Sequence, residues 1–165
     1  MVSDADFISF VDEELDAMTK MLESLGDDLA NRALDVPGAN SPYAILEHCL
    51  GVIEYWAGHI ALGRPSARDR DAEFQAHGTV SGLIQRTREA RARLRQDTVQ
   101  TTPSAPPHGP LDPEDAALPL GRTQGGALLH IFQELARHRG QMDVTQDLLR
   151  AGAPTRPAGT SAADA

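Results

Sequence analysis

Apolar residues recur at steps of three and four along four stretches of this chain, which is the spacing of an amphipathic helix. The first stretch covers about residues 4 to 32. The second begins at Ser41 and Pro42, an N-cap hydroxyl followed by proline at the first helical position, and continues to about Leu62. The third begins at Thr79, and the fourth spans about residues 124 to 151. Four long helices and no credible strand predict an all-α fold, a four-helix bundle.

The segments between and after these helices differ from them in composition. Residues 63 to 78 form a long, charged link between the second and third helices. Residues 98 to 121 hold six prolines and show no helical periodicity. Residues 152 to 165 are mostly small or polar and contain proline and glycine. We therefore expect one domain over residues 1 to 151 and a disordered tail over residues 152 to 165.

Two polar residues face inward on the fourth helix. Glu134 and His138 are four residues apart, so they project from the same face. His138 lies within an apolar stripe that also contains Ile131, Leu135, Met142, Thr145 and Leu149. An uncompensated buried charge is costly, so this pair needs a partner. A divalent metal is one such partner, and a hydrogen-bonded or salt-bridged core pair is the alternative.

His48 lies on the inner face of the second helix, where a single histidine is most often a hydrogen-bonded core residue. Together with Glu134 and His138, however, it makes a plausible set of three metal ligands on two helices of one bundle. Three protein ligands leave one coordination position open, as in catalytic zinc sites. Zinc is the expected metal, and the same nitrogen and oxygen donors also suit nickel, iron(II) and manganese.

Four further residues lie near these candidates. His130, one turn before Glu134, is the next candidate as a ligand or an outer partner. His59 is interpreted as a pocket or core histidine, and Gln141 as a hydrogen-bond donor to His138. Cys49 follows His48 but points about 100° away around the helix, so it is interpreted as a small core residue.

Charge and composition exclude several classes of function. The net charge of −9 argues against a nucleic-acid partner, although the third helix carries a run of five arginines. The simplest interpretation of that run is a solvated face that pairs with the acidic first helix, and contact with an anion or a thiol cofactor is the alternative. No apolar run approaches the ~20 residues that span a bilayer, so no membrane partner is expected. The N-terminus lacks signal-peptide features, and the lone cysteine fits a reducing cytoplasm. The chain contains no P-loop, GxGxxG, GxSxG, CxxC or HExxH motif.

Three segments carry a family resemblance: SPYAILEHCLGVIEYWAGHIALGRP, RDRDAEFQAHGTVSGLI and LLHIFQELARHRGQMDVTQDLL. They resemble the DinB-like superfamily and, more narrowly, its branch related to mycothiol-dependent maleylpyruvate isomerase. The resemblance covers residues 4 to 151 apart from the proline-rich segment. It implies a four-helix bundle with a long link after helix two, a homodimer, and a divalent metal held by His48, Glu134 and His138. The further C-terminal domain of the isomerase is missing here, so specificity for maleylpyruvate is not expected.

The resemblance also implies a function. Members activate a low-molecular-weight thiol, here mycothiol or a similar thiol, for S-transfer to a small electrophile or for its isomerisation. Arginines of the third helix or of residues 64 to 70 are candidates to bind an anionic group of the second substrate. The alternatives are a metal-dependent hydrolase that uses metal-bound water and a bundle that binds a metal or ligand without catalysis.

Overall fold

Four long helices form the bundle that the sequence predicts. The computed structural model describes residues 3 to 157. The long helices are α1 (Asp4–Ala30), α2 (Pro42–Ile53), α4 (Val80–Gln100) and α7 (Gln124–Arg150). At its end α2 continues without a break into η1 (Glu54–Ala61), a π-helix of wider turns. The predicted all-α fold class is confirmed.

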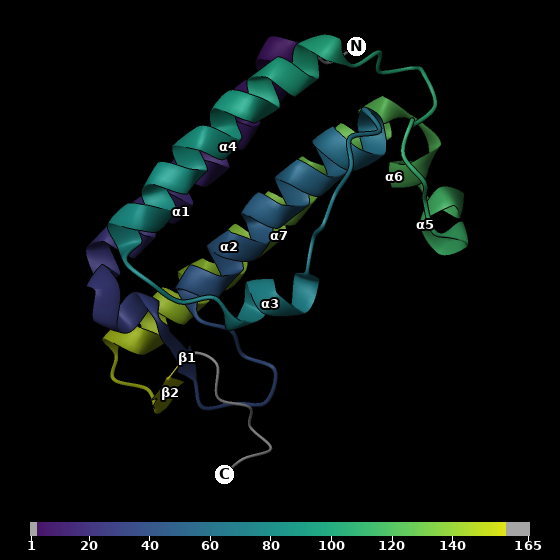
Figure 1. Cartoon of the computed structure of the whole chain (residues 1–165). Helices are drawn as coiled ribbons and strands as arrows, with labels where there is room; N and C mark the ends of the chain where they lie inside the picture. Colours follow the sequence, from purple (N-terminus) through teal and green to yellow (C-terminus); the bar gives the residue numbers. More distant parts are fainter. Residues whose placement is uncertain (1–2, 158–165) are drawn as a thin grey trace.

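The long helices pack in two adjacent pairs (Figure 1). Helix α1 packs against α4 and α7, and α2 packs against α7 and α4. The link after η1 returns along the bundle before α4 begins, so that α2 and α4 run in the same direction (Figure 1). The sequence predicts a long link over residues 63 to 78, but its charged composition does not predict this path along the bundle. None of the helices described is long and apolar enough to cross a membrane.

The core lies where the apolar stripes meet. On α1 the stripe predicted from the sequence is buried from Phe7 to Leu25, and only its last member, Leu29, is partly exposed. On α7, Ile131, Leu135 and Met142 are fully buried. The spacing of three and four therefore identifies the inner face of both helices correctly.

Arginines of α4 pair with acidic residues of α1, as the charge pattern predicts. Arg91 lies 2.6 Å from Asp16 and 3.3 Å from Asp12, and Arg95 also pairs with Asp12. Arg86 pairs instead with Glu47 of α2, at 2.6 Å. These partners account for three of the five arginines in the run.

Short helices lie in segments that were predicted to be irregular. They are α3 (Arg70–Gln75), α5 (Pro113–Ala117) and α6 (Pro119–Arg122). Asp69 caps α3 by accepting a hydrogen bond from the backbone of Ala72 at 3.0 Å. Helix α3 packs against α2, and this contact gives it a part in the candidate site.

A small sheet corrects two expectations from the sequence. Strand β1 (Arg32–Leu34) pairs antiparallel with β2 (Thr155–Pro157), so the chain does contain strands. The expected disorder of residues 152 to 165 therefore fails for Thr155 to Pro157, and residues 158 to 165 lie outside the described residues. Strands of three residues cannot show a convincing alternation in sequence. Here they pair the connection after α1 with the segment after α7.

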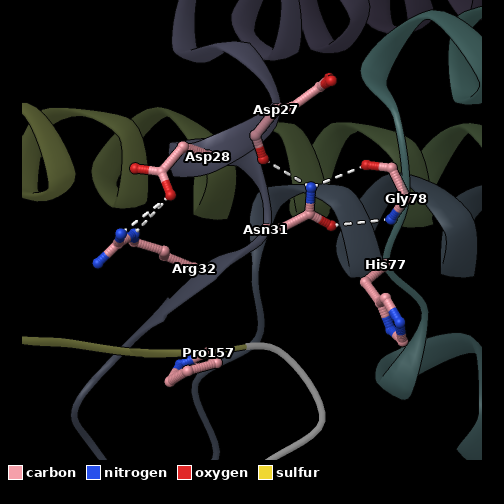
Figure 2. A pocket seen from close by; sticks show the side chains of 7 residues that line it. All are labelled: Asp27, Asp28, Asn31, Arg32, His77, Gly78 and Pro157. Atoms are coloured by element: carbon pink, nitrogen blue, oxygen red, sulfur yellow. Dashed lines mark hydrogen bonds and ion pairs between the residues drawn. The ribbon is translucent and has the colours of Figure 1, made fainter.

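Polar contacts fix the end of α1 near this sheet (Figure 2). The amide of Asn31 donates to the carbonyl of Gly78 at 2.8 Å and accepts from its N–H at 3.0 Å. A carboxylate oxygen of Asp27 accepts from the N–H of Val80, the first residue of α4, at 2.7 Å. The polar groups around this hollow hydrogen-bond to one another, and these bonds join the end of α1 to the start of α4.

Replacing Arg156 with alanine should lower the free energy of unfolding by about 1 to 3 kcal/mol, because its guanidinium donates to several carbonyls. It reaches the carbonyl oxygens of Leu34 at 2.7 Å, Val36 at 3.0 Å and Ala39 at 2.8 Å. Urea unfolding measures the change. The control is Arg88→Ala, which removes an exposed arginine of α4 and should have little effect. Equal stabilities for the two variants would show that the hydrogen bonds of the Arg156 side chain do not stabilise the bundle.

Candidate metal centre

The three predicted ligands come together in the structure. His48 of α2 and Glu134 and His138 of α7 each offer one donor atom, and these atoms lie within 4.8 Å of one another. The helical repeat explains the convergence, because Glu134 and His138 are one turn apart on the face of α7 that packs against α2. The sequence interpretation placed the same three side chains in one cluster.

His48 is held on three sides. Its side chain is 3% exposed, and its Nδ1 lies 2.8 Å from Oε2 of Glu73 in α3. Phe74, the next residue of α3, stacks on the imidazole with 4.5 Å between ring centroids, and His138 meets it edge-on at 4.9 Å. Because Nδ1 is engaged by Glu73, Nε2 is the nitrogen left free to bind a metal.

His138 is oriented from its own helix. Its Nδ1 lies 3.0 Å from the carbonyl oxygen Oε1 of Gln141, which accepts the hydrogen bond. The sequence interpretation had Gln141 donating, and the structure reverses that role. His138 Nε2 lies 3.5 Å from Oε2 of Glu134. Nδ1 of each histidine thus has an acceptor, and Nε2 is the nitrogen that a metal would bind, in His138 by replacing the proton that Nε2 shares with Glu134.

Glu134 is an ionised carboxylate in this cluster. The hydrogen bond from His138 lowers the pKa of Glu134 to about 2, against the opposing effect of burial. The electrostatic effects of Arg137 and His130 lower the pKa of Glu134 further. Arg137 Nη1 lies 2.6 Å from Oε1 of Glu134. The side chain of Glu134 is 12% exposed, so its charge is largely withdrawn from water.

The donor set suits a divalent metal. Imidazole nitrogen and carboxylate oxygen bind zinc at about 2.0 to 2.2 Å, so the donors of a shared ion lie within about 4 Å of one another. The separation of 4.8 Å or less in the structure requires only small side-chain movements to reach that arrangement. Two neutral nitrogens and one anionic oxygen also leave a fourth position open for a further ligand.

A pocket adjoins the cluster on the side of η1. His48 and Glu134 form part of its wall, together with Tyr55, Trp56 and His130. His130 packs edge-on against Trp56, with 4.5 Å between ring centroids. His130, the next candidate ligand in the sequence interpretation, thus lies in the pocket wall rather than among the three clustered donors.

Two candidates from the sequence remain, His59 and Cys49. Nδ1 of His59 lies 2.6 Å from the carbonyl oxygen of Arg64, which fits its interpretation as a core or pocket histidine. Cys49 is fully buried, as predicted. Burial, with the nearby carboxylates of Glu134 and Glu73, raises the pKa of the Cys49 thiol. A buried thiol with a raised pKa is a poor nucleophile, so Cys49 is a packing residue.

Sequence reasoning missed the contribution of α3 to this centre. Glu73 and Phe74 both contact His48, yet they lie in a link that shows no apolar periodicity. The signal that could have revealed the helix is Asp69, an N-cap residue with acidic residues in the turn that follows. A single capped turn of this kind predicts a helix but not its contact with α2.

Comparison with known families shows to which family the chain belongs. A family model described as mycothiol-S-transferase matches residues 6 to 151. No curated protein and no solved structure gives a match. The matched span covers the four long helices, except the first two residues of α1, and the three clustered residues. It confirms the resemblance to the mycothiol-related branch of DinB-like proteins. The chain therefore belongs to the mycothiol S-transferase family.

Proposed function

We propose that this protein is a divalent-metal-dependent enzyme that joins a low-molecular-weight thiol, mycothiol or a close analogue, through its sulfur to a small electrophile. Family membership supports a mycothiol-related S-transferase function. The observation that carries the metal dependence is the convergence of His48, Glu134 and His138 within 4.8 Å. Zinc is the metal we propose, because the donor set is that of a catalytic zinc site.

Each residue of the cluster would have its own role in binding the metal. His48 and His138 supply neutral nitrogen donors, and Glu134 supplies the negative charge that offsets a dication. A bound divalent cation lowers the pKa of a coordinated thiol, so that the thiolate predominates at neutral pH. In the transfer, the thiol would give its proton to solvent and its sulfur would bond to the electrophilic carbon. The electron pair of the bond broken there would go to the departing chloride, the epoxide oxygen or the second alkene carbon.

The adjoining pocket supports a role for the link in binding the second substrate. Arg68 and Arg70 line the pocket beside Tyr55 and Trp56. Arg68 is already paired with Glu73, whereas Arg70 is exposed and lies over the ring of Phe74 at 5.3 Å from its centroid. Arg70 is thus the better placed of the two to bind an anionic group of the electrophile.

Two further proposals concern the protein as a whole. We propose a homodimer, and the support is that α1 and α7 carry several exposed apolar side chains, which include Phe10, Leu129 and Val144. Phe10 is 55% exposed and Val144 62% exposed, so a partner surface would remove considerable apolar area from water. We also propose a cytoplasmic location, which fits the use of one buried, unpaired cysteine.

A thiol-transfer assay tests the function. Untagged protein is stripped of metal, reloaded with zinc or nickel, and mixed with mycothiol and a panel of electrophiles that includes an aryl chloride, an epoxide and an unsaturated acid. We expect thioether formation that requires both metal and thiol, with chloride released from the aryl chloride. Cys49→Ser should keep the activity, because Cys49 is buried and is not the sulfur donor.

Other results would favour the rival functions. Turnover of an ester or amide without thiol would identify a hydrolase. Metal binding without turnover of any substrate in the panel would favour a bundle that holds a metal or ligand without catalysis. Either result would contradict the S-transferase proposal.

A further inference from the structure

Glu73 joins the candidate metal centre to the link between η1 and α4. Its carboxylate is 10% exposed and lies between two partners. On one side Arg68 donates from Nε to Oε1 at 2.7 Å and from Nη2 to Oε2 at 2.8 Å. On the other side Oε2 lies 2.8 Å from Nδ1 of His48. Arg68, Glu73 and His48 therefore form a continuous chain of hydrogen bonds that ends at the cluster.

The absence of a side chain at Gly51 makes room for this carboxylate. Gly51 lies one turn after His48 on α2, and its φ is that of an ordinary helical residue. A Cβ at this position would lie 1.8 Å from Oε1 and 2.5 Å from Cδ of Glu73. No side-chain carbon approaches so closely, so any residue larger than glycine would push the carboxylate away. The surface of α2 beside His48 is thus shaped to receive Glu73.

We propose that Glu73 is a positioning residue for the metal: it fixes the tautomer and the ring orientation of His48 so that Nε2 faces Glu134 and His138. The proposal rests on the proposed function, since it concerns the same metal site. It extends the site from three residues on α2 and α7 to a fourth on α3, which Arg68 holds in place.

The chemistry of the contact sets the direction of the hydrogen bond. Arg68 holds Glu73 as a carboxylate, because its guanidinium donates to both oxygens, at 2.7 Å to Oε1 and 2.8 Å to Oε2. An ionised carboxylate only accepts hydrogen bonds, so Nδ1 of His48 must carry the proton at 2.8 Å. In a neutral imidazole the other nitrogen then presents a lone pair, which is the form that binds a metal.

Arg68 also lies within reach of the imidazole, with Nη2 at 3.3 Å from Nδ1. Arginine only donates, so this contact would favour an unprotonated Nδ1. The contact with the carboxylate is 0.5 Å shorter, and an unprotonated Nδ1 there would place two lone pairs against each other. The carboxylate therefore decides the tautomer, and Arg68 acts by orienting the carboxylate.

Both oxygens of Glu73 are occupied by these partners, and that distinguishes it from a ligand. Oε1 accepts from Arg68, and Oε2 accepts from Arg68 and His48. Phe74 adds to the effect by stacking on the imidazole, with 24° between the two ring planes. Two successive residues of α3 thus restrict the position of one ring, and an outer partner that orients a metal-binding histidine typically affects metal affinity by about 10- to 100-fold.

Zinc affinity of Glu73 variants tests the proposal. Affinity is measured by competition with a chromophoric chelator on untagged protein. We expect Glu73→Ala to weaken zinc binding by about 10- to 100-fold. Glu73→Gln keeps an acceptor oxygen at the same reach and should recover part of that loss. Glu47→Ala is the matched control, because it also removes a carboxylate of this region that is paired with an arginine. Equal affinities for Glu73→Ala and Glu47→Ala would overturn the proposal.

The second measurement needs no bound metal, and the result that decides it comes from the wild-type protein alone. In the metal-free protein at pH 8, nitrogen-15 spectra of the imidazole rings report which nitrogen of His48 carries the proton. We expect the proton on Nδ1 in the wild type, and a mixture of both tautomers in Gly51→Ala, whose Cβ displaces the carboxylate. A wild-type His48 protonated on Nε2 would overturn the proposal.

The two measurements separate this inference from the function. Zinc binding through the positioned His48 without transfer of the thiol would refute the S-transferase assignment and support the role of Glu73. Thiol transfer by the wild type, together with unchanged zinc affinity in Glu73→Ala, would support the function and refute the role of Glu73.

Discussion

Glu134→Gln should abolish the zinc-dependent rise in melting temperature that we expect of the wild-type protein, while leaving the bundle folded. Glutamine keeps the size of the side chain and one carbonyl acceptor, but it removes the negative charge that offsets a dication. Loss of a direct ligand should cost at least as much as loss of an outer partner, about 10- to 100-fold in affinity. Zinc at about 100 times its Kd stabilises the folded state by about 2.7 kcal/mol, which for a chain of this length corresponds to roughly 5 to 10 °C.

The matched control removes the neighbouring charge instead. Arg137→Gln breaks the 2.6 Å ion pair with Glu134 but leaves the carboxylate in place, so it should keep the response to zinc. Thermal unfolding of the three proteins, each with and without zinc, gives the comparison. If zinc raises the melting temperature of none of them, His48, Glu134 and His138 form a polar core cluster, and the metal-dependent function is wrong.

The sequence predicts the three clustered residues because all of them lie in long helices. His48, Glu134 and His138 occupy inward positions in regular stripes, and such stripes determine which side of a helix faces the core. The packing of two stripes then brings the residues together, whatever the details of the connections. For the same reason the buried positions of α1 and α7 follow from spacing alone.

The parts of the site that sequence reasoning missed depend on contacts between distant segments. Glu73 reaches His48 only because α3 packs on α2 and because Gly51 leaves space there. The capping residue Asp69 indicates a helix, but no local pattern predicts that this helix packs against α2. In the same way, Thr155 to Pro157 pair with β1 across more than a hundred residues of chain. Short elements of this kind are stabilised by tertiary contacts, which sequence periodicity does not encode.

The position of the pocket depends on a further feature that spacing does not predict. The second helix was predicted as one regular element to Leu62, whereas its last eight residues form the π-helix η1. A π-helix has more residues per turn, so it shifts the faces on which successive side chains lie. Tyr55 and Trp56 both line the pocket, from the first turn of η1. Trp56, which is 6% exposed, belongs to the core as well as to the pocket wall, whereas Tyr55 is only partly buried.

Lowering the pH should reduce the free energy of unfolding of the metal-free protein, because it protonates Glu134. Its pKa falls from 4.5 to about 2 on folding. A carboxyl group with a lowered pKa in the folded state contributes stability above pH 4.5, and the contribution is lost as the pH falls toward 2. The difference in pKa corresponds to about 3 kcal/mol at neutral pH, of which about 2 kcal/mol should be lost by pH 3. The side chain is 12% exposed, so screening by water reduces this value little.

Comparison with Glu134→Gln isolates that contribution from the other acidic groups. Both proteins are stripped of metal and unfolded with urea at several pH values between 7 and 3. Glutamine does not titrate, so the stability difference between wild type and variant should shrink by about 2 kcal/mol across this range. Other carboxyl groups titrate in both proteins and cancel from the difference. A difference that stays constant with pH would mean that His138 and Arg137 do not stabilise the ionised form of Glu134 in the folded protein.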